Sequence, residues 1–340
     1  MTDIIVRTSA HAGHITLNRP RALNALTWDM CLAIEAAIDA WRDDDTIRLV
    51  IIDGAGDRAF CSGGDIADMY ASGQSRDYGY GRKFWRDEYR LNAKLAKFPK
   101  PIVTFLHGFT MGGGVGVGCH ASHRIVCETS QIALPECTIG LVPDVGGSLL
   151  LANAPGYIGT YLGLTGDRMD AGDAIFTGFA DYFIPQDQWD ALKSSLENTG
   201  DVEKIAPRSP PAARLQDWQP ALDRAFAHNS LGAIYTHLHN DTPSAYARKH
   251  MDRNSPLAMA CAIALINAAR VNSTIEAALE QEYRFTHRAV QHSDFIEGIR
   301  AAIIDRDRHP KWQHAKFDAV TQADITKMTA PLGADALTLT

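Results

Sequence analysis

The chain has 340 residues, of which 46% are hydrophobic and 21% charged, and its 33 basic and 40 acidic side chains give a net charge of −7. These values are ordinary for a globular protein with a sizeable core and exclude intrinsic disorder. The pI near 6.0 argues against a nucleic-acid partner, which would favour a basic face. No apolar run is long enough to span a membrane and no signal-peptide core is present, so we expect a cytoplasmic protein without a membrane partner.

The six cysteines are sparse for this length and include no C-x-x-C pair. A disulfide scaffold and a zinc site are therefore both unexpected. The 13 histidines include His237 and His239, two residues apart, but no H-E-x-x-H motif. We expect buried free thiols in a reducing compartment, surface or hydrogen-bonded core histidines, and no bound metal or cofactor.

The first half alternates short β-branched runs with helical patterns, which predicts an α/β fold. Thr27 precedes a helical pattern whose apolar face includes Ile34 and Trp41. A strand, a glycine-rich loop, a helix and another strand follow each other in the region around residues 101–134. Strands are predicted at residues 4–7, 14–17, 48–52, 101–106, 122–127 and 131–134.

The second half is mostly helical. Residues 197–220 carry four prolines among polar residues, which predicts a connector. Ser255 followed by Pro256 is typical of a helix start, and residues 273–291 continue with helical spacing. We therefore expect three consecutive parts, which are a catalytic α/β core at 1–195, a connector at 196–222 and a helical C-terminal region at 223–340.

Two glycine clusters, at residues 61–66 and 107–118, each lie between a predicted strand and a predicted helix. The second does not match G-x-G-x-x-G, and the chain has no P-loop and no G-x-S-x-G nucleophile elbow. Glycines let the backbone approach a ligand and present N–H groups to it. The two loops could supply two N–H donors to one carbonyl oxygen as an oxyanion hole, or each could be only a tight turn.

Glu136 and Asp144 lie eight residues apart among apolar and turn residues. An acid in such surroundings loses solvation, which raises its pKa toward the range useful for general acid–base work. These two are therefore the candidate catalytic carboxylates. The alternative for Asp144 is a helix N-cap ahead of Gly146 and Gly147.

The sequence resembles the crotonase, or enoyl-CoA hydratase/isomerase, superfamily at residues 18–26, 60–66, 107–116 and 135–147. The resemblance implies a ββα spiral core that binds an acyl-CoA thioester, and a homo-oligomer that is a trimer or hexamer. It implies that the backbone N–H groups of Gly64 and Gly113 form the oxyanion hole. By the same resemblance, the residues that line the CoA moiety are Arg21, Ala22, Leu23, Asp65 and Ile66.

One departure from the superfamily pattern separates its branches. Enoyl-CoA hydratases use two glutamates, of which the second matches Glu136, but the first falls at Gly116, which has no side chain. The chain looks instead like the 3-hydroxyisobutyryl-CoA hydrolase branch, a likeness that extends into the C-terminal half. In that branch Glu136 and Asp144 are the expected catalytic carboxylates, and Glu88 is a further acid at the substrate pocket.

We therefore expect an acyl-CoA thioester hydrolase acting on a short, branched 3-hydroxyacyl thioester, as in valine breakdown. Two alternatives stay open at this point. The first is an enoyl-CoA hydratase or isomerase that uses Glu136 alone as acid and base. The second is a catalytically inert CoA-binding or assembly protein. Thiol release would indicate the hydrolase, loss of enoyl absorbance would indicate the hydratase or isomerase, and an unchanged thioester would indicate the inert protein.

Overall fold

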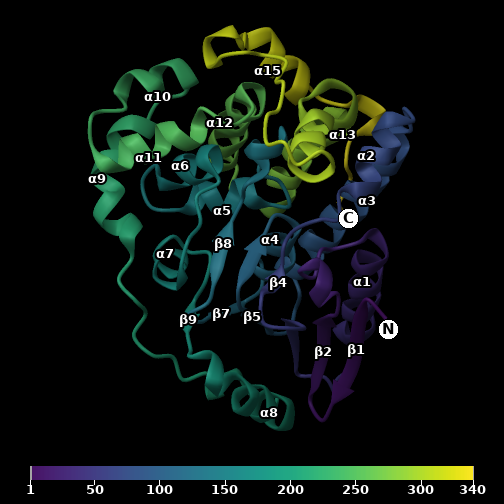
Figure 1. Cartoon of the computed structure of the whole chain (residues 1–340). Helices are drawn as coiled ribbons and strands as arrows, with labels where there is room; N and C mark the ends of the chain where they lie inside the picture. The colour runs from purple at the N-terminus through teal and green to yellow at the C-terminus, as the bar shows by residue number, and fades with distance from the viewer. Residues whose placement is uncertain (1, 340) are drawn as a thin grey trace. The chain divides into compact units, whose positions relative to one another are not determined.

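The computed structural model describes residues 2–339 and shows a mixed α/β fold, as predicted (Figure 1). The chain forms two compact units, each assembled from three stretches of sequence. The expected division at residues 195 and 222 differs from the limits of these units, because the chain passes repeatedly from one unit to the other. The first unit contains Met1–Gly64, Arg90–Ala133 and Arg168–Arg214, and the second contains Asp65–Tyr89, Leu134–Asp167 and Leu215–Thr340.

The larger sheet of the first unit has six strands in the order β1-β2-β3-β5-β7-β9. β1 pairs with β2 in antiparallel fashion, and every later pair of neighbours is parallel. The register places Ile15 beside Ile52, and Ile52 beside Thr104. The six strands are β1 (Ile4–Ser9), β2 (Ala12–Leu17), β3 (Leu49–Gly54), β5 (Ile102–Leu106), β7 (His123–Val126) and β9 (Tyr182–Phe183).

A smaller parallel sheet of the first unit has the order β4-β6-β8. Its members follow β3, β5 and β7 in the sequence, so each successive strand pair contributes one strand to each sheet. A helix or helical turn then returns the chain to the next pair, which is the connection that parallel neighbours require. This repetition is the ββα spiral that the family resemblance implies. The three strands are β4 (Ala59–Cys61), β6 (Phe109–Met111) and β8 (Gln131–Ala133).

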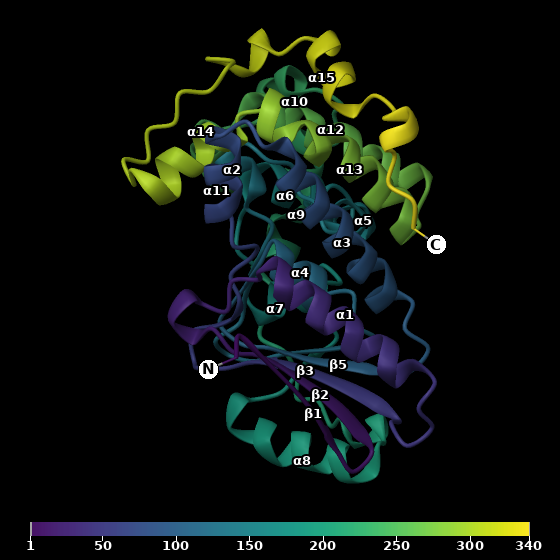
Figure 2. The same cartoon turned by 90° about the vertical axis from the view of Figure 1, so that its right-hand side faces the viewer.

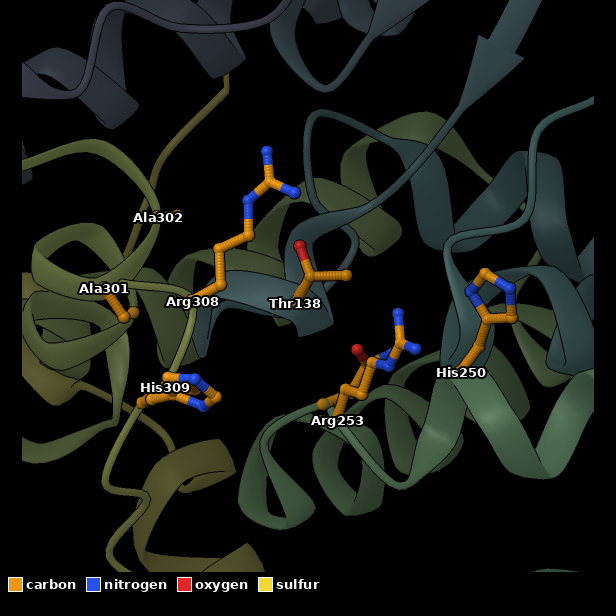
Figure 3. Close-up of a pocket in the computed structure, with 10 residues that line it drawn as sticks. Thr138, His250, Arg253, Ala301, Ala302, Arg308 and His309 are labelled. Carbon is orange, nitrogen blue, oxygen red and sulfur yellow. The ribbon is translucent and has the colours of Figure 1, made fainter. Parts of the chain in front are cut away.

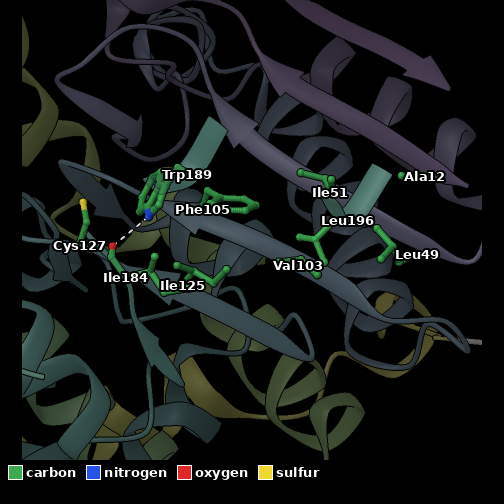
Figure 4. Packing of buried hydrophobic residues seen from close by; sticks show 10 residues of the cluster. All are labelled: Ala12, Leu49, Ile51, Val103, Phe105, Ile125, Cys127, Ile184, Trp189 and Leu196. Atoms are coloured by element: carbon green, nitrogen blue, oxygen red, sulfur yellow. Dashed lines mark hydrogen bonds between the residues drawn. The ribbon is translucent and has the colours of Figure 1, made fainter. Parts of the chain in front are cut away.

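Helices cover both faces of the larger sheet (Figure 2). Adjacent side chains in a strand point to opposite faces of the sheet, so side chains two residues apart share a face. Leu49 and Ile51 lie on the face that packs against α8 (Trp189–Thr199). On this face the indole N–H of Trp189 donates a 2.9 Å hydrogen bond to the carbonyl of Ile184 (Figure 4). The other face packs against α1 (Trp28–Arg42), where a Cβ at Gly13 would overlap the Trp41 ring.

The second unit is helical, and α12 packs against several of its other helices. These neighbours are α5, α6, α13 and α15, and 11 of the 16 residues of α12 are buried. The helices of this unit are α2 (Ala67–Gln74), α5 (Gly147–Asn153), α6 (Ile158–Thr165), α9 (Arg214–Phe226), α10 (Leu231–His237), α11 (Thr242–Met251), α12 (Pro256–Val271), α13 (Ile275–His292), α14 (Phe295–Ile299) and α15 (Gln322–Thr329). α3 (Tyr78–Ala96) belongs to both units, and α4 (Gly113–Gly118) and α7 (Ala171–Phe176) belong to the first.

The predicted starts of the helices are confirmed. The Thr27 hydroxyl accepts a 3.2 Å hydrogen bond from the Met30 N–H, and the Ser255 hydroxyl accepts one of 3.1 Å from the Ala258 N–H. All six predicted strands form, with ends that shift by at most two residues. All six cysteines are free and buried, as expected. Within residues 2–339 no single helix has the length and apolarity to cross a membrane, although α11 and α12 together, bent by 119°, meet that criterion.

Candidate active site

Three predicted acids, Glu88, Glu136 and Asp144, are brought together inside the second unit. They come from α3, from the 3-10 helix η2 (Glu136–Ile139) and from the loop before α5. Their exposed fractions are 2%, 5% and 4%. No lysine, arginine or histidine among the described residues forms an ion pair with any of them. The cluster is therefore a set of buried carboxyl groups without a countercharge.

The position of Glu88 follows from the periodicity of α3. The helix face around Glu88 is buried. One turn before Glu88 it carries Phe84 and Trp85, and beyond Glu88 it carries the neighbouring Tyr89 and, one turn later, Asn92. A carboxylate on this apolar face is unusual, because charged side chains are rarely buried without a partner. Its Oε1 atom has no hydrogen-bond partner among the described residues. Glu88 is thus placed where a bound group could use it.

Glu136 is the first residue of η2, directly after Pro135. The turn is held tightly against α14, because a Cβ at Gly298 would overlap the backbone of Ile139. Gly140 ends the turn with φ of 74°, in the left-handed region that glycine adopts most easily. This fixed turn directs the Glu136 side chain inward, and its Oε2 atom has no hydrogen-bond partner among residues 2–339.

Asp144 is held by a hydrogen bond from a tyrosine. The Tyr89 hydroxyl donates to Asp144 Oδ2 at 2.7 Å, and the backbone carbonyl of Asp144 accepts from the Gly147 N–H at 2.6 Å. The N-cap of α5 is Gly146, and no side chain of its own caps the helix. The alternative that Asp144 is a helix N-cap is therefore wrong. Its carboxyl group is turned toward Tyr89 instead.

The capping role at α5 belongs to Glu282 of α13. Its Oε2 accepts a 2.7 Å hydrogen bond from the Gly146 N–H, and its Oε1 accepts one of 2.9 Å from the Ser148 N–H and a further one from the Ser148 hydroxyl. The carboxyl oxygens thus satisfy N–H groups at the start of α5 that have no intrahelical acceptor. Sequence reasoning gave no role to Glu282 or to Tyr89.

Burial raises the pKa of every acid in this cluster. Loss of solvation is the largest cause for Glu88 and Glu136, whose pKa values lie well above the ordinary range, and the charge of Asp144 adds to it. Burial raises the pKa of Asp144 to about 7, although the Tyr89 hydrogen bond opposes the increase. Burial also raises the pKa of Glu282 to about 8. Carboxyl groups in this range can take up and release protons near neutral pH.

The two predicted glycine loops lie next to each other in the first unit. They follow the neighbouring strands β4 and β6, and a Cβ at Gly63 would lie 3.3 Å from the Met111 carbonyl oxygen. Gly63 and Gly112 have φ of 112° and 50°, so each loop turns through a conformation that favours glycine just before Gly64 and Gly113. Gly113 begins α4, where N–H groups have no intrahelical carbonyl partner.

The residues expected to line a CoA moiety are accessible. Arg21 and Ala22 are exposed on the 3-10 helix η1 (Pro20–Ala22), and Leu23 follows it with φ of 52°. The buried Asn24 holds this turn in place, because its side-chain amide donates a hydrogen bond to the Ala59 carbonyl at 2.8 Å. Asp65 and Ile66, which belong to the second unit, are half-buried just before α2. In the described part of the chain no three His, Cys, Asp or Glu side chains cluster in a way that would hold a metal ion.

Comparison with known proteins assigns the chain to a family. The profile of the enoyl-CoA hydratase/isomerase family matches residues 12–329. The chain belongs to the enoyl-CoA hydratase/isomerase family. Mitochondrial 3-hydroxyisobutyryl-CoA hydrolases of Danio rerio and Homo sapiens are 33% and 32% identical to it, over 97% and 98% of this chain and 90% of each relative.

Two solved structures of the family superpose on this chain over nearly its whole length. An enoyl-CoA hydratase from Rhodobacter sphaeroides 2.4.1 has a TM-score of 0.97 and 51% identity, over 99% of this chain and 100% of that one. A carnitinyl-CoA dehydratase from Mycobacterium thermoresistibile has a TM-score of 0.95 and 36% identity, over 100% and 99%. Within this family, the position that the resemblance gives to a first hydratase glutamate is Gly116, which is buried inside α4.

Proposed function

We propose that this family member is an acyl-CoA thioester hydrolase that acts on 3-hydroxyisobutyryl-CoA, in valine breakdown. The observation that carries the proposal is the buried cluster of Glu88, Glu136 and Asp144, in which the pKa of Asp144 is about 7. Thioester hydrolysis needs a group that activates water or attacks the carbonyl, and a proton for the leaving thiolate. The names of the curated relatives support the same substrate.

In the proposed reaction a water oxygen adds to the thioester carbonyl carbon, the C–S bond breaks, and the CoA thiolate takes up a proton. The N–H groups of Gly64 and Gly113 stabilise the oxyanion, a contact that is typically worth about 3–4 kcal/mol of barrier per donor. Glu136 either activates the water or attacks the carbonyl directly to give a mixed anhydride that water then hydrolyses. Asp144 orients the water or the 3-hydroxyl group of the substrate.

The alternative activity is hydration or isomerisation of an enoyl-CoA. The 51% identity to a protein named an enoyl-CoA hydratase favours it. A two-glutamate hydration mechanism would have to run without one of its carboxylates, because Gly116 offers no side chain. Glu136 would then act alone as both acid and base. The cluster contributes Asp144 and Glu88 beside Glu136, which supports hydrolysis more directly than hydration.

The test is a comparison of three substrates with the purified full-length protein. We expect thiol release from 3-hydroxyisobutyryl-CoA, and a kcat/KM at least ~100-fold lower for isobutyryl-CoA, because a buried polar group that pairs with the hydroxyl would be left unpaired. Crotonyl-CoA should lose its enoyl absorbance slowly or not at all. A larger kcat/KM for hydration than for hydrolysis would reject the proposal. An intact thioester that stays bound would instead indicate an inert CoA-binding protein.

A further inference from the structure

A basic cavity lies within the second unit, and none of the buried acids described above lines it. Its volume is about 650 Å³, and its lining includes Thr138, His250, Arg253, Arg308 and His309 (Figure 3). His250 and His309 stand on opposite sides of the opening, with the two arginines and Thr138 between them. None of the residues that line the cavity is an aspartate or glutamate. The cavity therefore presents two permanent positive charges and two imidazoles to whatever enters it.

The positive charge of the cavity is not cancelled by ion pairs. Among the described residues neither Arg253 nor Arg308 forms a salt bridge. The acids nearest in sequence to Arg308 are Asp305 and Asp307, and both accept hydrogen bonds from Arg300, at 2.6 and 2.7 Å. Arg300 also pairs with Glu297, at 2.8 Å. These carboxylates are held by Arg300, which leaves the guanidinium groups of the cavity free for another anion.

The segment that carries Arg308 is fixed before any ligand arrives. The Arg308 N–H donates to the Ala301 carbonyl at 3.1 Å, and Arg300 donates to the His309 carbonyl at 3.2 Å. Arg308 has φ of 57°, in the left-handed region that non-glycine residues seldom adopt. On the other side, the Trp312 indole N–H donates to the Arg253 carbonyl at 3.0 Å. Groups that are already ordered lose less entropy on binding.

The chemistry of the lining points to phosphate. Guanidinium groups bind phosphate oxygens through two parallel N–H donors, and imidazoles add further donors or a flat face. A volume of about 650 Å³ is far more than one phosphate ion fills and falls within the range of sites for small organic ligands. The Thr138 hydroxyl, which donates to the Pro135 carbonyl at 2.6 Å, can accept a hydrogen bond from the ligand.

We propose that this cavity binds a phosphate-bearing ligand of nucleotide size. Such a ligand has two sources, which are the phosphorylated adenosine end of a CoA thioester and a free nucleotide. The first source rests on the proposed function and the second does not. Thr138 and Glu136 lie two residues apart in η2, one exposed and one buried, so an occupant would contact the turn that carries the catalytic candidate.

Calorimetry with the full-length protein tests the site itself. The probes are adenosine 3′,5′-bisphosphate, ADP and inorganic pyrophosphate at low salt. The Arg253→Gln/Arg308→Gln double variant should bind at least one of these probes tenfold or more weakly than the wild type, about 1.4 kcal/mol per factor of ten. Arg306→Gln is the matched control, because Arg306 is exposed, lies two residues from Arg308 and does not line the cavity. Thermal melting would confirm that each variant is folded.

Kinetics with the CoA thioester and the pantetheine thioester of the same acyl group then show whether the occupant is CoA or a free nucleotide. If CoA is the occupant, the double variant raises KM for the CoA thioester at least tenfold and leaves KM for the pantetheine thioester unchanged. If a free nucleotide is the occupant, both KM values stay the same while probe binding is lost. The proposal is overturned if no probe binds the wild type, or if the double variant binds every probe as the wild type does. The calorimetric result holds whether or not the thioesters are hydrolysed, so it stands apart from the proposed function.

Discussion

The Tyr89 hydroxyl donates a 2.7 Å hydrogen bond to Asp144 Oδ2, and both residues are buried. This bond stabilises the ionised form of Asp144, whereas burial destabilises it. The balance leaves the pKa of Asp144 at about 7, so the carboxyl group changes its charge near neutral pH. Tyr89, which lies on α3, therefore influences the protonation of a candidate catalytic acid that lies in the loop before α5.

Replacing Tyr89 by Phe removes the donor and leaves the ring. We expect the pKa of Asp144 to increase by about one to two units, because a hydrogen bond to a charged group contributes about 1.5–3 kcal/mol. The acidic limb of the kcat profile should move to higher pH by that amount. Tyr283→Phe is the control, because that hydroxyl donates to a backbone carbonyl, of Arg82, at 3.3 Å. An unmoved acidic limb in Tyr89→Phe would show that Asp144 does not set it.

The buried acids also set how stability depends on pH. Glu88, Glu136, Asp144 and Glu282 have pKa values above their ordinary range, so the folded chain binds protons that the unfolded chain, with carboxyl pKa values near ~4, releases. Their contribution to the free energy of unfolding is complete below about pH 4 and is lost as the pH rises through about 7 for Asp144 and about 8 for Glu282.

Glu136→Gln should accordingly separate stability from activity. A neutral amide avoids burying a charge, so we expect its Tm to exceed that of the wild type by a few degrees at about pH 8 and the difference to shrink at about pH 5. Its kcat should fall at least ~100-fold, while thioester binding stays within a few-fold. The exposed Glu280→Gln on α13 is the control for both measurements. Turnover near the wild-type rate would remove Glu136 from the mechanism.

Glu282→Gln tests whether the loop that carries Asp144 must be held in place. The amide presents one oxygen and one NH2 group to donors at Gly146 and Ser148, so one hydrogen bond at least is lost. We expect kcat to fall about 10- to 100-fold with little change in KM, because small displacements of a reacting group are costly. Ser148→Ala, which removes only the hydroxyl contact, should show a smaller loss of the same kind. Equal losses in kcat and affinity would instead indicate general unfolding of the pocket.

Gly113→Val tests the proposed oxyanion hole. Gly113 is buried at the start of α4. The space there is tight, because a Cβ at the next residue, Gly114, would overlap the Cys61 carbonyl. A branched side chain there should displace the Gly113 N–H and lower kcat about 100-fold, the usual effect of losing one such donor. Gly232→Val is the control, because Gly232 is exposed in α10 and an added Cβ would lie 3.9 Å from Phe317. A folded Gly113→Val protein that keeps more than about a tenth of the wild-type kcat would contradict an oxyanion contact at this residue.

The elements that sequence patterns predicted are those whose signals are local. β3 and β5 are β-branched runs, and the Ser255-Pro256 start of α12 is a capping pattern within two residues. β4 and β6 have three residues each and lie next to glycines, so their pairing depends on neighbours rather than on their own composition. The interleaved units likewise follow from long-range contacts, which leave no mark in the composition of consecutive segments.

In the candidate site, too, local sequence predicted some features, whereas others depend on contacts between distant residues. Burial of Glu136 and Asp144 was predictable from the apolar residues around them, and the raised pKa of each follows from it. The N-cap alternative for Asp144 was equally reasonable from local sequence, and it is wrong because a carboxylate more than 130 residues away occupies the N–H groups of Gly146 and Ser148. Nothing near Glu282 in the sequence indicates that partner. Side chains that act across the fold need the coordinates.

The enclosure of all six thiols bears on how the enzyme can be followed. Burial raises the pKa of Cys119 to about 12 and that of Cys137 well above its ordinary range, so these two thiols hold little of the thiolate that reacts with a disulfide reagent. The other four cysteines are buried as well, which keeps the reagent from them in the native protein. A colorimetric thiol reagent would therefore count released coenzyme without a background from the protein. In denaturant the same reagent would titrate six groups per chain, so one chromophore reports turnover in the folded state and the loss of that state.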